Sequence, residues 1–254
     1  MGEIDATTVS SFFSQIASKM ACAELGEIDA STVSTFFILA AFKIEISASA
    51  RKELDQYLAT GLNIVRDYVR PGENRLSDIL RDLLDPRGPH GQGSLFLEAF
   101  LREVGASGMV VDEDSGTIRE HYTDAGRRID LVLTFACQKA ICIENKPPSA
   151  PDQKNQIKDY ADYLQRKFPN GYVLCYLTSF GHPPSAYSIG EEERKELKAA
   201  GKLIFISYER EITNWLEACF KECKAEKVRW LLADFDDFIN EQLKVWGEES
   251  DDAT

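Results

Sequence analysis

The sequence predicts an α/β fold with a mixed central β-sheet flanked by helices. Short runs rich in β-branched and aromatic residues alternate with helical segments over most of the chain. The 254 residues are enough for one full-sized domain with an extension. Hydrophobic residues make up 44% and charged residues 28%, which is the composition of a folded globular chain.

The first 47 residues are predicted to form a helical extension that contains a duplicated segment. GEIDATTVSSFF begins at Gly2 and GEIDASTVSTFF begins at Gly26. Repeats of this period occur in solenoids, but two copies without a third favour a local duplication of a helix start, with Asp, Ser or Thr as the cap. We expect this extension to serve packing, self-association or binding of a protein partner.

Helices are predicted next, separated by Pro and Gly. Apolar residues recur at three- and four-residue steps over 48–69, and Pro71 and Gly72 end that segment. Two further helices are expected over 73–84 and 94–105, and the loop between them is rich in Pro and Gly.

Strands and helices then alternate. Strands are expected at 110–111, 117–122, 129–135, 140–144, 172–180 and 202–208. Helices are expected at 152–168, 191–200, 211–223 and 226–246, so that one domain spans 48–247. The acidic tail, 248–254, is expected to be frayed.

The charge and the cysteines limit the class of protein. A net charge of -13 counts against a general DNA-coating protein, because phosphate contacts need Lys and Arg, but it suits carboxylates that hold a divalent cation. The six cysteines include no C-x-x-C pair, which favours buried free thiols in a reducing compartment. With no signal-peptide pattern and no run long enough to span a membrane, we expect a cytoplasmic protein without membrane association.

The chemically informative pattern is a pair of predicted strands. In RRIDLVL, the apolar neighbours Ile129 and Leu131 are predicted to share one face, so that Asp130 points to the other. In AICIENK, Glu144 and Lys146 share a face opposite to the isoleucines. A tight link between the two strands brings Asp130 close to Glu144.

Two converging carboxylates suit Mg²⁺, which prefers hard oxygen ligands and lowers the pKa of a bound water. Lys146 then orients the attacking water or stabilises developing charge on a phosphate. The alternative is a cross-strand pair of opposite charges on a solvated face, without catalysis.

These residues resemble the signature of the PD-(D/E)xK nuclease superfamily. Asp130 is followed, after thirteen residues, by Glu144, one further residue and Lys146. The sequence over about 73–219 resembles a bacterial family of this superfamily, family four. The chain departs from the signature at Ile129, which replaces a proline that many members lack.

The resemblance implies a restriction-endonuclease-like core and a Mg²⁺- or Mn²⁺-dependent nuclease that acts on DNA. It implies catalysis by Asp130, Glu144 and Lys146, with Glu73 from a helix before the strands as a further metal ligand. The alternative is a binding or scaffold protein on the same fold. The acidity of the chain favours the scaffold, and the intact set of site residues favours the enzyme.

Four residues are predicted to contact the substrate. Gln156 and Tyr160 form a Q-x-x-x-Y pattern found in part of the superfamily, and their spacing places them on one helix face. Tyr160 either stacks on a base, holds the phosphate or belongs to the core. Arg128 contacts phosphate or is a solvated hairpin charge. His90 contacts substrate or packs within its loop.

Overall fold

The structure, a computed structural model, describes residues 59, 61–106, 108–148 and 150–243. The chain divides into two compact units, Met1–Gly61 and Leu62–Thr254, and nearly all the described residues belong to the second. The duplicated N-terminal segment, the predicted boundary after residue 47 and the acidic tail lie outside the described residues. A role of the N-terminal extension in oligomerisation or partner binding therefore stays a prediction.

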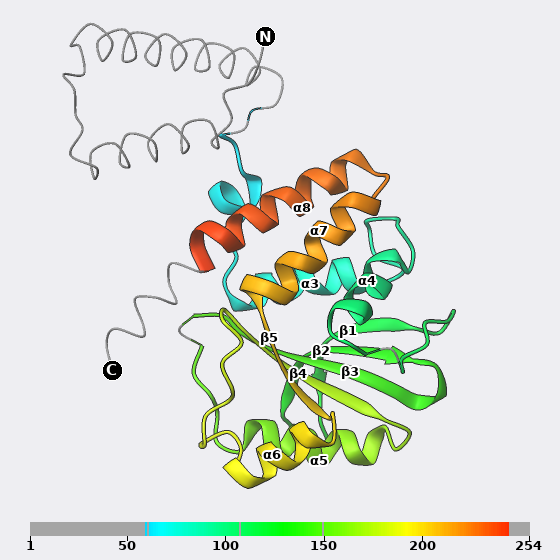
Figure 1. The fold of residues 1–254 in the computed structure, drawn as a ribbon, viewed down its shortest axis with the longest axis vertical. Helices are drawn as coiled ribbons and strands as arrows, with labels where there is room; N and C mark the ends of the chain where they lie inside the picture. Colours follow the sequence, from blue (N-terminus) through cyan, green and yellow to red (C-terminus); the bar gives the residue numbers. More distant parts are fainter. Residues whose placement is uncertain (1–58, 60, 107, 149, 244–254) are drawn as a thin grey trace, which may run out of the picture. The chain divides into compact units, whose positions relative to one another are not determined.

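A five-stranded mixed sheet, with the strands in chain order, forms the centre of the second unit (Figure 1). The first three strands are antiparallel, and the last two run parallel to the third. Their bounds are β1 (Gly116–Tyr122), β2 (Arg128–Phe135), β3 (Lys139–Lys146), β4 (Tyr172–Thr178) and β5 (Leu203–Ser207). The predicted α/β class with a mixed sheet is confirmed.

Helices cover both faces of the sheet (Figure 1). One face carries α5 (Gln156–Lys167) and α6 (Glu191–Ala199). The other carries α3 (Glu73–Leu84), α4 (Leu95–Glu103), α7 (Thr213–Glu222) and α8 (Glu226–Phe238). Short π-helical turns, η1 (Val65–Val69), η3 (Tyr208–Ile212) and η4 (Ile239–Leu243), and a 3₁₀ turn, η2 (Ala136–Gln138), complete the described elements. Among the described residues, no helix is both long and apolar enough to cross a membrane.

The strands divide their side chains between two hydrophobic cores. Leu131 and Leu133 of β2 belong to the core under α3, α4 and α7, and Val132 belongs to the core under α5. This alternation is what the period of two predicts for a sheet covered on both faces. Ile129 is an exception that corrects the sequence analysis, because it joins the α5 core instead of the face of Leu131.

The exception has a local cause in how β2 is paired around Asp130. Pairing with β3 ends at Leu131, so the chain before that residue is no longer held in register by β3. On β1, Glu120 stands between the residues paired with Ile129 and Leu131, and its backbone has a φ of 56°. A non-glycine residue in this region interrupts the regular pleat, and such irregularities occur often beside functional sites.

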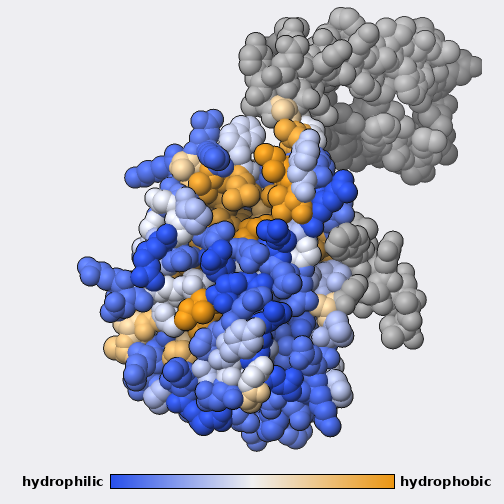
Figure 2. All heavy atoms as spheres, turned by 180° about the vertical axis from the view of Figure 1, so that it is seen from behind, coloured by the Kyte–Doolittle hydropathy of each residue, from blue (hydrophilic) through white to orange (hydrophobic). Residues whose placement is uncertain are grey.

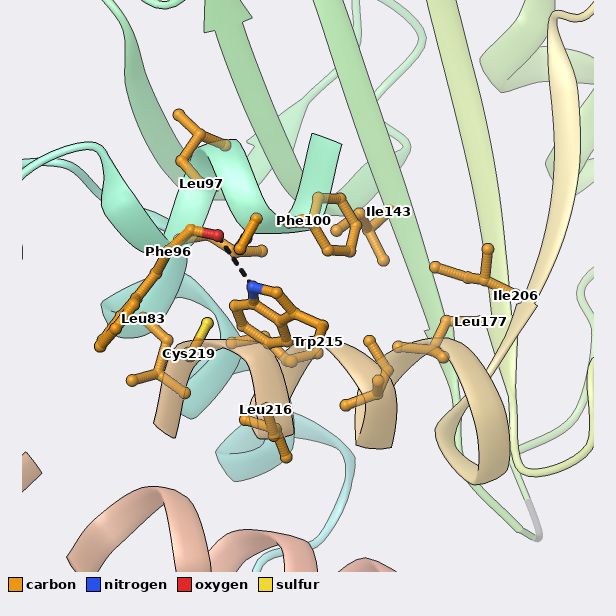
Figure 3. Packing of buried hydrophobic residues seen from close by; sticks show 14 of the residues in the cluster. Leu83, Phe96, Leu97, Phe100, Ile143, Leu177, Ile206, Trp215, Leu216 and Cys219 are labelled. Atoms are coloured by element: carbon orange, nitrogen blue, oxygen red, sulfur yellow. Dashed lines mark hydrogen bonds between the residues drawn. The ribbon is translucent and has the colours of Figure 1, made fainter. Parts of the chain in front are cut away.

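Trp215 of α7 occupies the centre of the larger core (Figure 3). Its side chain is fully buried, and its Nε1–H donates to the carbonyl oxygen of Phe96 at 2.8 Å. Its ring meets Phe100 edge-on, with 5.6 Å between the ring centroids. A buried indole with its N–H satisfied fixes α7 against α4 and, through the same core, against the sheet.

We expect Trp215→Ala to lower the free energy of unfolding by about 3–5 kcal/mol, because it leaves a cavity and removes the buried hydrogen bond to Phe96. Trp230 on α8 is 48% exposed and is the matched control, for which the expected loss is within about 0.5 kcal/mol. Urea unfolding followed by circular dichroism measures both. Equal losses in the two variants would contradict the packing of α7 described above.

Three predicted elements are corrected by the structure. Val110 and Val111 are not a strand; they lie in irregular backbone, and two residues are too few to pair. Of the predicted helix over 48–69, residues 48–58 and 60 lie outside the described residues, 61–63 are not helical, and a turn begins after Asn63, whose Oδ1 accepts the backbone N–H of Arg66 at 2.7 Å. Helix α5 begins at Gln156 and not at residue 152, since Asn155 has a φ of 54°.

The surface seen from behind is mostly hydrophilic, and hydrophobic side chains gather toward one end of it (Figure 2). A predominantly polar surface agrees with the net charge of -13.

Candidate active site

The predicted site lies where β2 and β3 stop pairing. Their antiparallel register runs from Phe135–Lys139 to Leu131–Ile143, one residue short of Asp130 and Glu144. On the outer sides, β1 still pairs with the start of β2, and β4 still pairs with the end of β3. A fork therefore opens between the two central strands. The Asp130 carboxylate reaches across it, where Oδ2 accepts the backbone N–H of Asn145 at 2.9 Å.

Glu144 is the most deeply buried carboxylate of the site, with 2% of its surface exposed. Its Oε1 lies 3.0 Å from the Lys146 Nζ and accepts the Gln156 Nε2–H at 2.7 Å. Its Oε2 is buried and has no hydrogen-bond partner. Burial, with the charge of Asp130 as a second cause, raises the pKa of Glu144 to about 8.

Asp130 and Lys146 complete the buried charged group. Burial raises the pKa of Asp130, the hydrogen bond from Asn145 opposes that shift, and the charge of Glu73 adds to it. Burial alone would lower the pKa of Lys146, but the adjacent Glu144 carboxylate outweighs burial and raises it. Lys146 is therefore an ammonium at neutral pH.

Strand β3 continues two residues beyond its predicted end at residue 144. Lys146 therefore lies on the strand itself, on the same face as Glu144.

Gln156 and Tyr160, one turn apart on α5, converge on this group, as the spacing predicted. The Gln156 Nε2 contacts the Glu144 Oε1 and also the Tyr160 hydroxyl at 3.2 Å. The Tyr160 hydroxyl donates to the carbonyl oxygen of Arg128 at 2.5 Å. Tyr160 is 1% exposed, so base stacking by its ring does not fit the structure. Both side chains hold parts of the site in place.

Comparison with known families identifies the superfamily of the chain. A family model of the PD-(D/E)XK nuclease superfamily, its family four, matches residues 64–237. The chain belongs to the PD-(D/E)XK nuclease superfamily. The match covers all five strands and α3 to α7, which carry every site residue discussed above. Searches among curated proteins and among solved structures found no significant match.

The remaining predicted residues of this PD-(D/E)XK protein have different surroundings. Glu73 is the half-buried first residue of α3, near enough for its charge to raise the pKa of both Asp130 and Glu144. Within the described part of the chain, no three His, Cys, Asp or Glu side chains are grouped as a ready-made cation site. Glu73 thus stands close to the two carboxylates but does not yet complete a three-ligand cluster with them.

Arg128 and His90 do not contact the buried group through their side chains. The Arg128 side chain is partly exposed and forms an ion pair with Glu120 at 3.0 Å. The His90 Nδ1 accepts the backbone N–H of Gln92 at 3.0 Å, and its Nε2 contacts the carbonyl oxygen of Asp85 at 2.9 Å. Both ring nitrogens therefore bond to backbone groups of the loop, which agrees with the alternative that His90 packs within its loop.

The sequence analysis missed three residues of the PD-(D/E)XK site. The Arg119 Nη1 lies 3.8 Å from the Asp130 Oδ1. Asn145 and Tyr208 are fully buried behind the fork and hydrogen-bonded to each other. Asn145 carried a usable signal, because strand alternation places this amide on the apolar face of β3, where a polar side chain needs partners. Arg119 and Tyr208 carried none.

Proposed function

We propose that this protein is a metal-dependent nuclease that hydrolyses phosphodiester bonds in DNA, with Asp130, Glu144 and Lys146 as its catalytic residues. The observation that carries the proposal is the unpartnered Glu144 Oε2. Buried carboxylate oxygens are almost always satisfied by a donor or a cation. Lys146 pairs with Glu144 through Oε1, and Arg119 lies 3.8 Å from the Asp130 Oδ1, so a divalent cation is the partner that fits the remaining Glu144 oxygen.

Asp130 and Glu144 are the proposed ligands of Mg²⁺ or Mn²⁺. Glu144 has its Oε1 held by Gln156 and its Oε2 available to an ion. The Asp130 Oδ2 accepts the Asn145 N–H, and its Oδ1 lies 3.8 Å from the Arg119 Nη1, too far for a hydrogen bond, so an ion can still take this oxygen. Mg²⁺ is commonly held by one or two carboxylates and keeps several waters, so two protein ligands are sufficient. Mn²⁺ accepts the same oxygen ligands. Glu73 is proposed as the third carboxylate, directly or through water.

The ion would neutralise charge on the scissile phosphate and lower the pKa of a water. The Lys146 ammonium has three N–H donors, and Glu144 accepts one of them. The others orient the attacking water and stabilise the negative charge that develops on the phosphate. Gln156 holds the Glu144 Oε1, which keeps Oε2 free for the ion. Burial of the group strengthens each of these charge interactions.

Arg128 is the proposed phosphate contact at the rim. Its ion pair with Glu120 is partly exposed, and exposed pairs contribute little, so a phosphate can displace the glutamate. His90 is not proposed as a substrate contact, because both of its ring nitrogens have partners within the loop.

A nicking assay tests the proposed function. Supercoiled plasmid, single-stranded DNA and RNA are incubated with the full chain in Mg²⁺, in Mn²⁺ and in EDTA. We expect conversion of plasmid to nicked or linear forms with either ion and none in EDTA. Cleavage of RNA alone would contradict the DNA assignment.

The net charge of -13 favours a second candidate, a catalytically inactive binding or scaffold protein on the same fold. This candidate predicts neither cleavage nor Mn²⁺ binding. Isothermal titration of Mn²⁺ beside the nicking assay therefore decides between the two.

The raised pKa of Glu144 predicts how stability depends on pH. The folded, metal-free protein holds a proton up to a pKa of about 8, whereas the ordinary value is 4.5. Between these values the unfolded chain has released that proton, so raising the pH favours unfolding. We expect the Tm in EDTA to fall from pH 5 to pH 8 and the Tm gain from Mn²⁺ to grow, because the ion displaces the proton. Thermal scans measure both trends, and Glu144→Gln should flatten them.

A further inference from the structure

Asn145, the residue between Glu144 and Lys146, links the site to α3. It points to the face opposite its two neighbours, and it is fully buried. Its Nδ2 donates to the Ser77 Oγ at 3.0 Å and to the carbonyl oxygen of Glu73 at 3.3 Å. The Ser77 hydroxyl donates to the same carbonyl oxygen at 3.0 Å. One amide thus ties the first turn of α3 to the catalytic strand.

This tie acts at Glu73, the residue whose charge raises the pKa of Asp130 and Glu144. Glu73 is the first residue of α3, and the residue before it, Gly72, offers no side-chain cap. The Asn145 amide therefore helps to hold the Glu73 backbone against β3, while Arg119 of β1 holds the next residue, Asn74, through its carbonyl oxygen at 3.2 Å. Moving that backbone moves the Glu73 carboxylate relative to Asp130 and Glu144.

Tyr208, at the start of η3, fixes which end of the Asn145 amide faces α3. Its hydroxyl donates to the Asn145 Oδ1 at 2.9 Å, and its ring is fully buried. With the oxygen occupied by this donor, the NH₂ end is turned to Ser77 and Glu73. An amide in the reversed orientation would place two acceptors, the Oδ1 and the Glu73 carbonyl oxygen, against each other.

We propose that Asn145 is a positioning residue that sets the Glu73 carboxylate at the metal site, and that Tyr208 holds its amide in the orientation this requires. The inference rests on the proposed function. It assigns the residue between the two catalytic residues of β3 a role in the affinity for a divalent ion. The backbone N–H of Asn145, which holds Asp130, is retained in every substitution and does not confuse the test.

The test separates positioning from stability. Asn145→Leu keeps the shape of the side chain but leaves the Tyr208 hydroxyl buried without an acceptor. The double variant with Tyr208→Phe removes both groups, so it should recover much of the lost Tm. We expect both variants to bind Mn²⁺ about 10–100-fold more weakly than the parent in calorimetric titration, as is usual when a group that orients a ligand is removed.

A Glu73→Gln background tests whether Asn145 affects Mn²⁺ binding through Glu73. If Asn145 acts through Glu73, adding Asn145→Leu to Glu73→Gln should change Mn²⁺ affinity by less than about twofold. Asn63→Leu is the matched control, because Asn63 is a buried amide whose Nδ2 donates to the Asp234 carbonyl oxygen at 2.8 Å. It should lower the Tm and leave Mn²⁺ affinity unchanged.

The inference would be overturned if the double variant bound Mn²⁺ with parental affinity. It would also be overturned if Asn145→Leu weakened Mn²⁺ binding as much in the Glu73→Gln background as in the parent. Either result would leave the proposed function standing. If the double variant does not fold, Tyr208→Phe alone, which removes one hydroxyl, should still weaken Mn²⁺ binding, and parental affinity there would overturn the inference. A parent chain that neither binds Mn²⁺ nor cleaves nucleic acid would instead remove the proposed function itself.

Discussion

Replacing Lys146 by methionine is expected to slow DNA cleavage by about 10²–10³-fold, the usual loss when a donor to transition-state charge is removed. Mn²⁺ binding should persist or tighten, because Lys146 is not a ligand and its positive charge lies 3.0 Å from the Glu144 Oε1. An interaction made only in the transition state is lost from turnover without a loss in ground-state binding. Nicking kinetics and calorimetric titration of Mn²⁺ measure the two quantities.

The variant should fold, because removing the Lys146 ammonium does not leave Glu144 as an unpaired buried charge. The pKa of Glu144 is raised to about 8, so this carboxyl already holds its proton in most of the metal-free protein at neutral pH. Lys158→Met is the matched control, because Lys158 pairs with Glu193 at 2.7 Å on the partly exposed side of α5. Parental cleavage in the Lys146 variant would show that the fork is not the catalytic site.

Replacing Glu144 by glutamine is expected to abolish cleavage. It should also abolish Mn²⁺ binding at the concentrations that saturate the parent. The loss in cleavage should exceed about a thousandfold, since the charge stabilisation supplied by the ion disappears with its ligand. The amide keeps the size of the side chain and can still accept the Gln156 Nε2–H. The effect therefore isolates the negative charge of Glu144 from its packing.

Glu193→Gln, on the partly exposed α6 surface, should leave both quantities at the parental level. The two site variants have opposite signatures, because Glu144→Gln loses ion binding and Lys146→Met keeps it. A Glu144→Gln variant that still bound Mn²⁺ tightly would place the ion elsewhere, and the scaffold alternative would then become the better account of this fold.

The fork between β2 and β3 explains how an acidic chain can concentrate opposite charges in a buried place. Where the ladder ends at Leu131–Ile143, backbone groups need other partners, and the Asp130 carboxylate supplies one to Asn145. The Arg119 guanidinium, on β1, lies behind Asp130 and donates to its carbonyl oxygen at 3.3 Å. The site is thus built from strand ends whose hydrogen bonds the sheet no longer satisfies.

The sequence alone determined the fold class and singled out the candidate site residues. Alternating apolar residues predicted the strands on both sides of Asp130 and Glu144, and helical spacing placed Gln156 and Tyr160 on one face of α5, because these patterns record burial along a single element. The structure confirmed the mixed sheet, and the family match confirmed the superfamily. The roles of the individual site residues stay predictions that the variants above test.

Only the tertiary structure decided what surrounds that set. Asn145 meets Ser77 and Tyr208, which lie 68 and 63 residues away in the chain, and no local pattern encodes which buried polar groups from different elements will meet. Ile129 left its predicted face because the pleat breaks where two strands stop pairing, and both ring nitrogens of His90 are bonded within its own loop. A strand's period fixes which side a residue faces, but hydrogen-bond partners depend on how separate elements pack, and that packing is a property of the whole fold.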